Sequence, residues 1–280
     1  MLAAASPLDG GLLSRHESCI VDKSSMPTPA SLREGALIAV AVVSLTIGVR
    51  SDTVARPAGR MARLPSVTLW AWERREDLRA VDPQRYAIAY LDQTLTIDLT
   101  VQSQPRRDPV VFSAQATRIP VVRIETTRQA LLNRETQHDV VTQIMRTVRE
   151  PGIAALQIDF DATRSQRPFY RSLLVELRQR MPPELPLSIT ALASWCSWDR
   201  WIHDLPVDEA VPMMFRMEPD RGRAAQDSAD FEIREPLCED SVGVSTTEPW
   251  PHNIEGKRIY IFADDGWPQD WSANLREKLP

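Results

Sequence analysis

Two carboxylates separated by a single residue give the clearest chemical signal in this sequence. Asp159 and Asp161 lie in the run Leu156–Asp161 (LQIDFD), which alternates apolar and polar residues as a β-strand does. Both aspartates and Gln157 should face one side of that strand, while the apolar residues pack under helices. Carboxylates this close repel each other, so one pKa should rise and leave a protonated acid beside an ionised base. Glycoside hydrolysis uses such a pair, usually placed on separate strands.

Short β-like runs recur along the chain after Arg60, and they supply the frame that would position these carboxylates. Eight such runs are present, which is the number that a closed parallel barrel requires. A ninth run, Leu95–Val101, is interpreted as an excursion or hairpin after the second strand. The eight runs are Val67–Trp72, Tyr86–Leu91, Ile119–Glu125, Ala155–Asp161, Leu187–Leu192, Glu209–Phe215, Ser241–Ser245 and Arg258–Ala263.

Helical patterns fill several of the gaps between the runs. Gln129–Arg149 and Phe169–Met181 carry apolar stripes at helical spacing, and Ser197–Leu205 and Gln269–Leu279 are shorter candidates. The gap Arg216–Glu239 is polar and poorly periodic, so the helix between the sixth and seventh strands is missing or replaced by a loop. Parallel strands need crossover connections. We therefore predict an α/β fold, a (β/α)8 TIM-type barrel, with a doubly wound parallel sheet as the alternative.

The carboxyl ends of the runs carry a carboxylate or a tryptophan in nearly every case, and barrel enzymes place their chemistry at these ends. We predict Asp161 as a catalytic acid, Asp159 as its pKa-setting or substrate-assisting neighbour, and Glu125 and Glu248 as the opposing carboxylate. Tryptophan rings stack on sugars and offer an N–H donor to hydroxyls. The predicted substrate-binding residues are Trp72, Glu73, Asp92, Arg123, Gln157, Trp195, Arg216, Trp250 and Asp264.

Each of these assignments has a structural alternative. Acidic residues often cap a following helix, which explains one or two of the carboxylates but not the series. Large aromatic residues also fill cores, and about half of the eight tryptophans are expected there, with Trp198 and Trp201 facing the core. Arg123 is equally well interpreted as a counter-ion for Asp159 or as a ligand for substrate.

The overall composition excludes several classes of function. The 280 residues have a formal net charge of -5 and no basic run, so nothing predicts a nucleic-acid partner. No Gly-rich phosphate loop occurs, which leaves a nucleotide cofactor without support. The four histidines are scattered and no C-x-x-C is present, so we expect no metal. Carbohydrate is therefore the predicted partner, with no cofactor.

An apolar segment near the amino terminus predicts export. The 15 residues Gly35–Val49 are uncharged and mostly apolar, and Arg33 and Arg50 flank them. This length suits the core of a signal peptide, and Thr53–Ala55 offers a cleavage site. An uncleaved membrane anchor and a buried core helix are the alternatives. We predict an export signal or membrane anchor with a linker over 1–60, a barrel over 61–280, and an extracytoplasmic location.

Three cysteines are present, namely Cys19, Cys196 and Cys238. Cys196 and Cys238 could pair in an oxidising compartment. The order of the predicted strands, however, places Cys196 near the top of the barrel and Cys238 near the bottom. The sequence therefore leaves the disulfide open.

Several motifs together resemble a bacterial family of unknown function. The resemblance extends over about Ser66 to Asp264, and it implies little about activity because that family has no established reaction. The motifs that carry it are Trp70–Glu73 (WAWE), Leu156–Asp161 (LQIDFD), Ser165–Tyr170 (SQRPFY), Leu192–Cys196 (LASWC), Pro212–Arg216 (PMMFR) and Gly243–Trp250 (GVSTTEPW).

A wider similarity is to glycoside-hydrolase barrels of the chitinase type, whose fourth strand carries D-x-x-D-x-D-x-E with the final Glu as the acid. Aligning Asp159 and Asp161 with the second and third Asp puts Leu156 at the first Asp and Thr163 at the Glu. Either another carboxylate replaces the acid, or the barrel binds sugar without cutting it. The resemblance implies a glycoside-hydrolase-like barrel acting on a bacterial polysaccharide or cell-surface glycan. A non-catalytic glycan-binding protein or a structural envelope protein is the alternative.

Overall fold

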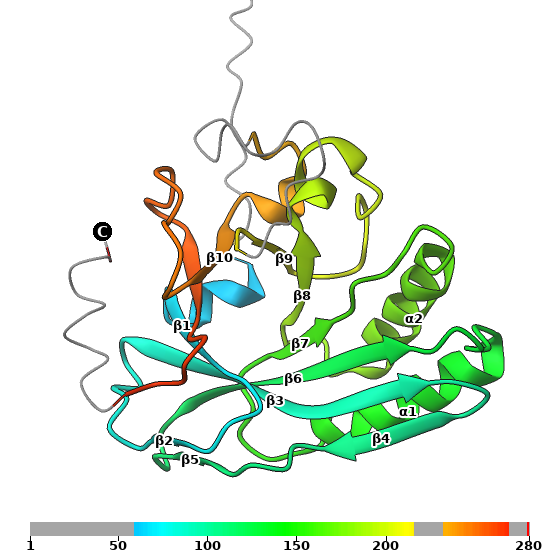
Figure 1. Cartoon of the computed structure of the whole chain (residues 1–280), viewed down its shortest axis with the longest axis horizontal. Helices are drawn as coiled ribbons and strands as arrows, with labels where there is room; N and C mark the ends of the chain where they lie inside the picture. Colours follow the sequence, from blue (N-terminus) through cyan, green and yellow to red (C-terminus); the bar gives the residue numbers. More distant parts are fainter. Residues whose placement is uncertain (1–58, 216–231, 269–278, 280) are drawn as a thin grey trace, which may run out of the picture. The chain divides into compact units, whose positions relative to one another are not determined.

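Eight parallel strands follow one another around a closed barrel (Figure 1). The computed structural model describes residues 59–215, 232–268 and 279. Strand β1 pairs with β11 on one side and with β3 on the other, and this double pairing closes the sheet. The strands of the barrel are β1 (Val67–Ala71), β3 (Tyr86–Ile97), β6 (Thr117–Thr126), β7 (Leu156–Asp159), β8 (Leu187–Leu192), β9 (Glu209–Met213), β10 (Ser241–Ser245) and β11 (Arg258–Phe262).

The predicted barrel is confirmed, and each of the eight predicted runs overlaps one of its strands. A doubly wound open sheet would leave two edge strands unpaired, so the pairing of β1 on both sides excludes that alternative. The ninth run forms a hairpin, as predicted. Its first part, Leu95–Ile97, prolongs β3, and β4 (Val101–Pro105) returns antiparallel to it from the pair formed by Ile97 and Val101.

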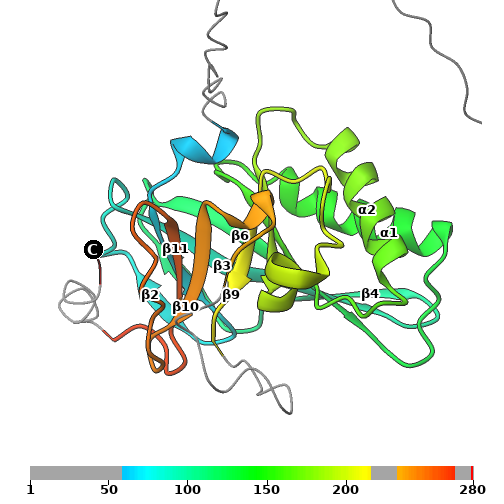
Figure 2. The same ribbon diagram turned by 90° about the horizontal axis from the view of Figure 1, so that it is seen from above.

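Two α-helices cover one flank of the barrel (Figure 2). Helix α1 (Arg134–Val148) begins at Asn133, whose side chain accepts a hydrogen bond from the Thr136 backbone N–H, and helix α2 (Arg167–Arg180) has a proline in its first turn. Their apolar stripes bury a core against the outward residues of β6, β7 and β8. No helix of the described ranges is long and apolar enough to span a membrane.

The predicted helix over Ser197–Leu205 is wrong. A short π-helix, η2 (Trp195–Asp199), takes its place, and turns follow it. Between the sixth and seventh strands the described part of the chain contains the 3-10 turn η3 (Pro236–Cys238). The predicted helix over Gln269–Leu279 lies outside the described residues except for Leu279.

A small parallel sheet covers another part of the outer surface. It consists of β2 (Glu76–Leu78) and β5 (Val110–Phe112), which pair along their full lengths. Leu78 and Phe112 pack against a second outward core, which includes Leu69 and Ile88. This sheet therefore covers the outward side chains of β1 and β3, as the two helices cover those of β6 to β8.

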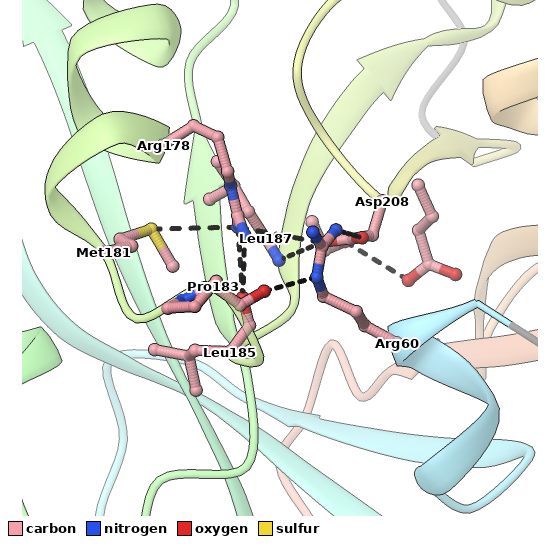
Figure 3. Close-up of polar contacts among 9 residues, drawn as sticks. Arg60, Arg178, Met181, Pro183, Leu185, Leu187 and Asp208 are labelled. Carbon is pink, nitrogen blue, oxygen red and sulfur yellow. Dashed lines mark hydrogen bonds and ion pairs between the residues drawn. The ribbon is translucent and has the colours of Figure 1, made fainter.

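The chain segment before β1 is fastened to the amino-terminal end of the barrel (Figure 3). This segment contains the 3-10 turn η1 (Arg60–Arg63). Arg60 donates to the Pro183 carbonyl and pairs with Asp208, each at 2.5 Å. Asp208 also accepts the Leu187 backbone N–H at 2.7 Å, with the Arg178 guanidinium 3.6 Å away. The chain therefore enters the barrel at the end opposite to the carboxyl ends of its strands.

Cys196 and Cys238 form a disulfide, with their Cα atoms 5.8 Å apart. The order of the predicted strands had placed the two cysteines at opposite ends of the barrel. In the structure, the segment before β10 lies against the turn after β8. There the backbone N–H groups of Arg234 and Glu235 both donate to the Cys196 carbonyl. Both sulfur atoms are buried with the core that α1 and α2 cover.

Removing this disulfide should destabilise the barrel. The double variant Cys196→Ser, Cys238→Ser should lose about 2–4 kcal/mol of unfolding free energy, because the cross-link restricts the unfolded chain. Denaturant unfolding in the presence and absence of a thiol reductant measures the difference. The reductant should weaken the parent protein and leave the double variant unaffected. Equal stability of the oxidised parent and the double variant would contradict a stabilising role.

Candidate active site

The inward side chains of the barrel form layers, because residues alternate between the two faces of each strand. The lower layer is a buried polar network across β7, β8, β9 and β11. Gln157 donates to the Ser188 hydroxyl at 3.1 Å, and Ser188 donates to Glu209 at 3.2 Å. Glu209 also accepts the Tyr260 hydroxyl and pairs with Arg258 at 3.3 Å. Gln157 has no exposed surface and lies below the barrel mouth, so its role as a substrate-binding residue stays a prediction.

The next layer towards the carboxyl ends contains the predicted Asp159. The register pairs Arg123 of β6 with Asp159 of β7. One Asp159 carboxylate oxygen accepts the Thr190 hydroxyl at 2.7 Å, and the other lies 3.4 Å from Nη1 of Arg123. The Nε of Arg123 donates to Glu125 at 2.7 Å. One guanidinium is therefore shared by two carboxylates, so the expected counter-ion role of Arg123 is present.

Glu125 and Asp161 lie one step higher, where β6 and β7 end. The Glu125 side chain is 49% exposed, whereas the Asp159 side chain is 12% exposed. Asp161 is exposed, and among the described residues it forms no hydrogen bond or ion pair. We call the group of Arg123, Glu125, Asp159 and Asp161 the carboxylate cluster.

The pKa values of both aspartates are raised. For Asp159, burial is the largest cause, and the charges of Asp161 and Glu125 add to it. The Thr190 hydrogen bond and the Arg123 charge oppose the rise in this pKa without cancelling it. Asp161 is open to solvent on one side, but the surrounding protein removes part of its hydration. This loss raises its pKa, and Arg123 lowers it by a smaller amount.

Aromatic rings line the inward face across the barrel mouth, by which we mean the end where the strands have their carboxyl ends. Trp70 and Trp72 meet edge to face at 5.6 Å between ring centroids, and Phe262 contacts both. Phe215 stacks on Phe262 at 5.5 Å. We call these four residues the aromatic wall. The Arg123 guanidinium lies 5.3 Å from the Trp72 ring centroid and links the wall to the carboxylate cluster.

Phe215 and Phe262 were absent from the predicted site. Apolar residues at inward positions give the same signal as core residues, so composition alone could not single them out. Strand parity could have found Phe262, because it lies two residues from the inward Tyr260 and from Asp264.

Two further predicted substrate-binding residues are misplaced. Asp92 lies in the middle of β3, at a bulge between Leu91 and Gln93, because β3 continues to Ile97. Its carboxylate accepts the Thr147 hydroxyl of α1 at 2.6 Å, on the outside of the barrel. Trp195 is 2% exposed in the core beneath the helices, where it meets Trp201 edge to face at 4.9 Å.

The other tryptophans after strand ends are also informative. Trp201 is partly buried against the helix-covered core, as predicted. Trp198 was expected to face the core, but it is 66% exposed. Trp250 is half-buried against the second outward core, and its indole N–H donates to the Ser245 carbonyl at 2.7 Å.

The remaining predicted residues that the structure describes lie in loops that follow β1, β10 and β11. Asp264 accepts the Ser245 hydroxyl and, at 2.7 Å, the Thr247 hydroxyl. Glu73 is exposed and Glu248 is half-buried. Arg216 lies outside the described residues. Their predicted roles in catalysis or substrate binding stay predictions.

The arrangement can offer a proton donor, fixed negative charge and apolar ring faces within one end of the barrel. Thr163 occupies the position at which chitinase-type barrels carry their acid, and its backbone N–H donates to Gln166 at 2.8 Å. Within residues 59–215 and 232–268, no three His, Cys, Asp or Glu side chains are grouped in a way that could hold a metal ion.

Comparison with known proteins agrees with the resemblance to a family of unknown function. No curated protein matches the chain. Among solved structures, the Bacillus cereus spore cortex-lytic enzyme SleL is similar, with 18% sequence identity and a TM-score of 0.38. The match covers 54% of this chain and 41% of the SleL chain, so this chain spans less than half of SleL. Residues 115–211, about a third of the chain, match the model of a family described as a domain of unknown function (DUF3142).

Proposed function

We propose that this protein is a glycoside-hydrolase-like barrel that acts on a bacterial polysaccharide or cell-surface glycan. Asp161 serves as the general acid, with a pKa that loss of hydration raises, and Asp159 is its substrate-assisting neighbour. The observation that carries this proposal is the state of Asp161. Its carboxyl group is open to solvent, has a raised pKa and has no hydrogen-bond partner among the described residues. A raised pKa keeps a proton on the carboxyl group, and access from solvent lets a leaving oxygen reach it.

The aromatic wall supports sugar as the ligand. Trp72 is half-buried and lies between Trp70 and the Arg123 guanidinium, so its orientation is fixed before any ligand binds. Flat rings held in this way stack on the apolar faces of sugars with little loss of side-chain freedom. The carboxylate cluster beside the wall would then meet the polar edge of the same sugar.

A non-catalytic glycan-binding protein is the second candidate, and one observation favours it. Glu125 and Asp159 are both bound to Arg123, and Thr163 stands at the acid position of chitinase-type barrels. Each contact with the guanidinium engages one carboxylate oxygen, so that oxygen is not available to a water or to a leaving group. A protein of this second kind would bind sugar at the barrel mouth without cutting it.

Paired substitutions separate the two candidates. Asp161→Asn should remove release of reducing ends from a responsive polysaccharide and change affinity by less than about two-fold, because protonation matters only in the transition state. Trp72→Ala should weaken affinity by about 1–3 kcal/mol, the range for a large apolar side chain. Calorimetry, reducing-end assays and thermal melts on each variant provide the measurements.

Trp198→Ala is the matched control for Trp72→Ala, since it removes an exposed indole away from the aromatic wall. It should leave affinity unchanged. If the parent protein binds members of a panel of bacterial glycans and cuts none of them, the result would favour the non-catalytic glycan-binding protein. Binding to no member of that panel would overturn both candidates.

We also infer that the barrel works outside the cytoplasm. Gly35–Val49 lies outside the described residues, and the support from the described part is the Cys196–Cys238 disulfide. Disulfides persist in the periplasm and outside the cell and are rare in the cytosol.

A reporter fusion tests this location. A reporter enzyme that is active only outside the cytoplasm, joined after Pro65, should be active in the native host. Deletion of Gly35–Val49 from the fusion should abolish that activity while leaving the reporter protein detectable in the cytoplasm. Activity that survives the deletion, or a fusion that stays in the cytoplasm with the segment intact, would contradict export through this segment.

A further inference from the structure

We propose that the mouth selects a glycan that carries a protonated amino group, the class to which de-N-acetylated hexosamine polymers belong. This inference rests on the proposed function and names its substrate class. It follows from the balance of charge and the free hydrogen-bonding positions of the carboxylate cluster.

Negative charge is in excess within the cluster. Three carboxylates surround one guanidinium, since Arg123 pairs with Glu125 and Asp159 and also interacts with the charge of Asp161. The one guanidinium is thus the positive charge that Glu125, Asp159 and Asp161 share. A cationic group on the ligand would balance this excess, whereas an anionic group would add to it.

Arg123 is poorly placed to bind an acidic sugar. Its Nε donates to Glu125 at 2.7 Å, and its Nη1 faces Asp159 at 3.4 Å. Its planar face lies over the Trp72 ring, 5.3 Å from the centroid. Bidentate recognition of a carboxylate needs two parallel N–H groups of the guanidinium. The contacts to Glu125 and Asp159 already occupy N–H groups on two of the three nitrogens, so a uronic acid would have to use the remaining N–H groups and would add a fourth carboxylate to the cluster.

Glu125 is the group that can receive an ammonium. Its Oε1 accepts from Arg123, while its Oε2 has no partner among the described residues, and the side chain is 49% exposed. Asp159 is less suited, because both of its oxygens are engaged, by Thr190 and by Arg123. An ammonium donor to Glu125 makes a charge-assisted hydrogen bond, which an acetamido N–H or a hydroxyl cannot match.

The aromatic wall contains one further unsatisfied group. Trp70 is 5% exposed, and its indole N–H has no hydrogen-bond partner in the described part of the chain. Buried polar groups normally have a partner, so a sugar oxygen or a water is expected beside it. The wall therefore offers ring faces to a sugar, with one buried donor behind them that lacks a protein partner in the described part of the chain, while Glu125 offers the acceptor for the amino group.

Three hexasaccharides of one linkage test the inference: chitosan-type with an amino group, chitin-type with an acetamido group, and cellulose-type with a hydroxyl at the same carbon. At mildly acidic pH, where the amine is protonated, calorimetry should show the chitosan-type ligand binding about ten-fold more tightly than the other two. Glu125→Gln should abolish this preference and leave affinity for the cellulose-type ligand within about two-fold of the parent.

Glu184→Gln is the matched control. It removes the same charge from an exposed residue at the opposite end of the barrel and should leave the preference intact. Thermal melts establish that each variant is folded. Asp161→Asn is a second variant of the cluster, and it should keep the preference for the chitosan-type ligand. Equal affinity for all three ligands would overturn the inference and leave the proposed function standing. Binding to none of the three would overturn the inference, and failure on the wider glycan panel would then overturn the proposed function as well.

Discussion

The double pairing of β1, with β3 on one side and β11 on the other, is the constraint on which the site depends. Closure fixes which side chains point inward, because residues alternate between the faces of each strand. Register then sets their depth, so that Gln157 and Ser188 lie beneath Asp159 and Thr190. A slip of one residue would turn the carboxylates towards the helices and the leucines of the core into the mouth.

This closure brings polar groups into an interior where an unpaired charge is costly. The lower layer offsets part of that cost by giving Glu209 three partners, Tyr260, Ser188 and Arg258, although burial still raises the pKa of Glu209. The upper layer offers fewer partners to its charged groups, because the carboxylate cluster has one guanidinium for three carboxylates. Ionisable groups with perturbed pKa values often cluster at functional sites, and such sites commonly lower the stability of the fold. The contrast between the two layers is therefore the main physical reason to place function at the mouth and structure beneath it.

Periodicity in the sequence was sufficient to predict the strands, the two long helices and the inward direction of Asp159 and Arg123. Periodicity did not predict the positions of residues that depend on where a strand ends or on a segment that is distant in the sequence. Asp92 was misplaced because β3 runs on to Ile97, and strand parity says nothing about Trp195, which follows β8 in a π-helical turn. The Cys196–Cys238 disulfide depends on a crossing that strand order does not encode. Phe262 was overlooked because inward aromatic residues resemble core residues.

Burial raises the pKa of Asp159, so its ionisation costs stability, and the pH dependence of unfolding for Asp159→Asn measures this cost most directly. A carboxyl group whose pKa is raised on folding stabilises the fold below its ordinary pKa of about 3.9, and this contribution is lost as the pH rises through the folded-state value. Urea unfolding of both proteins from acidic to neutral pH should therefore show the variant gaining stability relative to the parent protein as the pH rises. If the parent instead gains stability over the variant across that range, Arg123 and Thr190 outweigh burial, and Asp159 is an ordinary ion-paired residue.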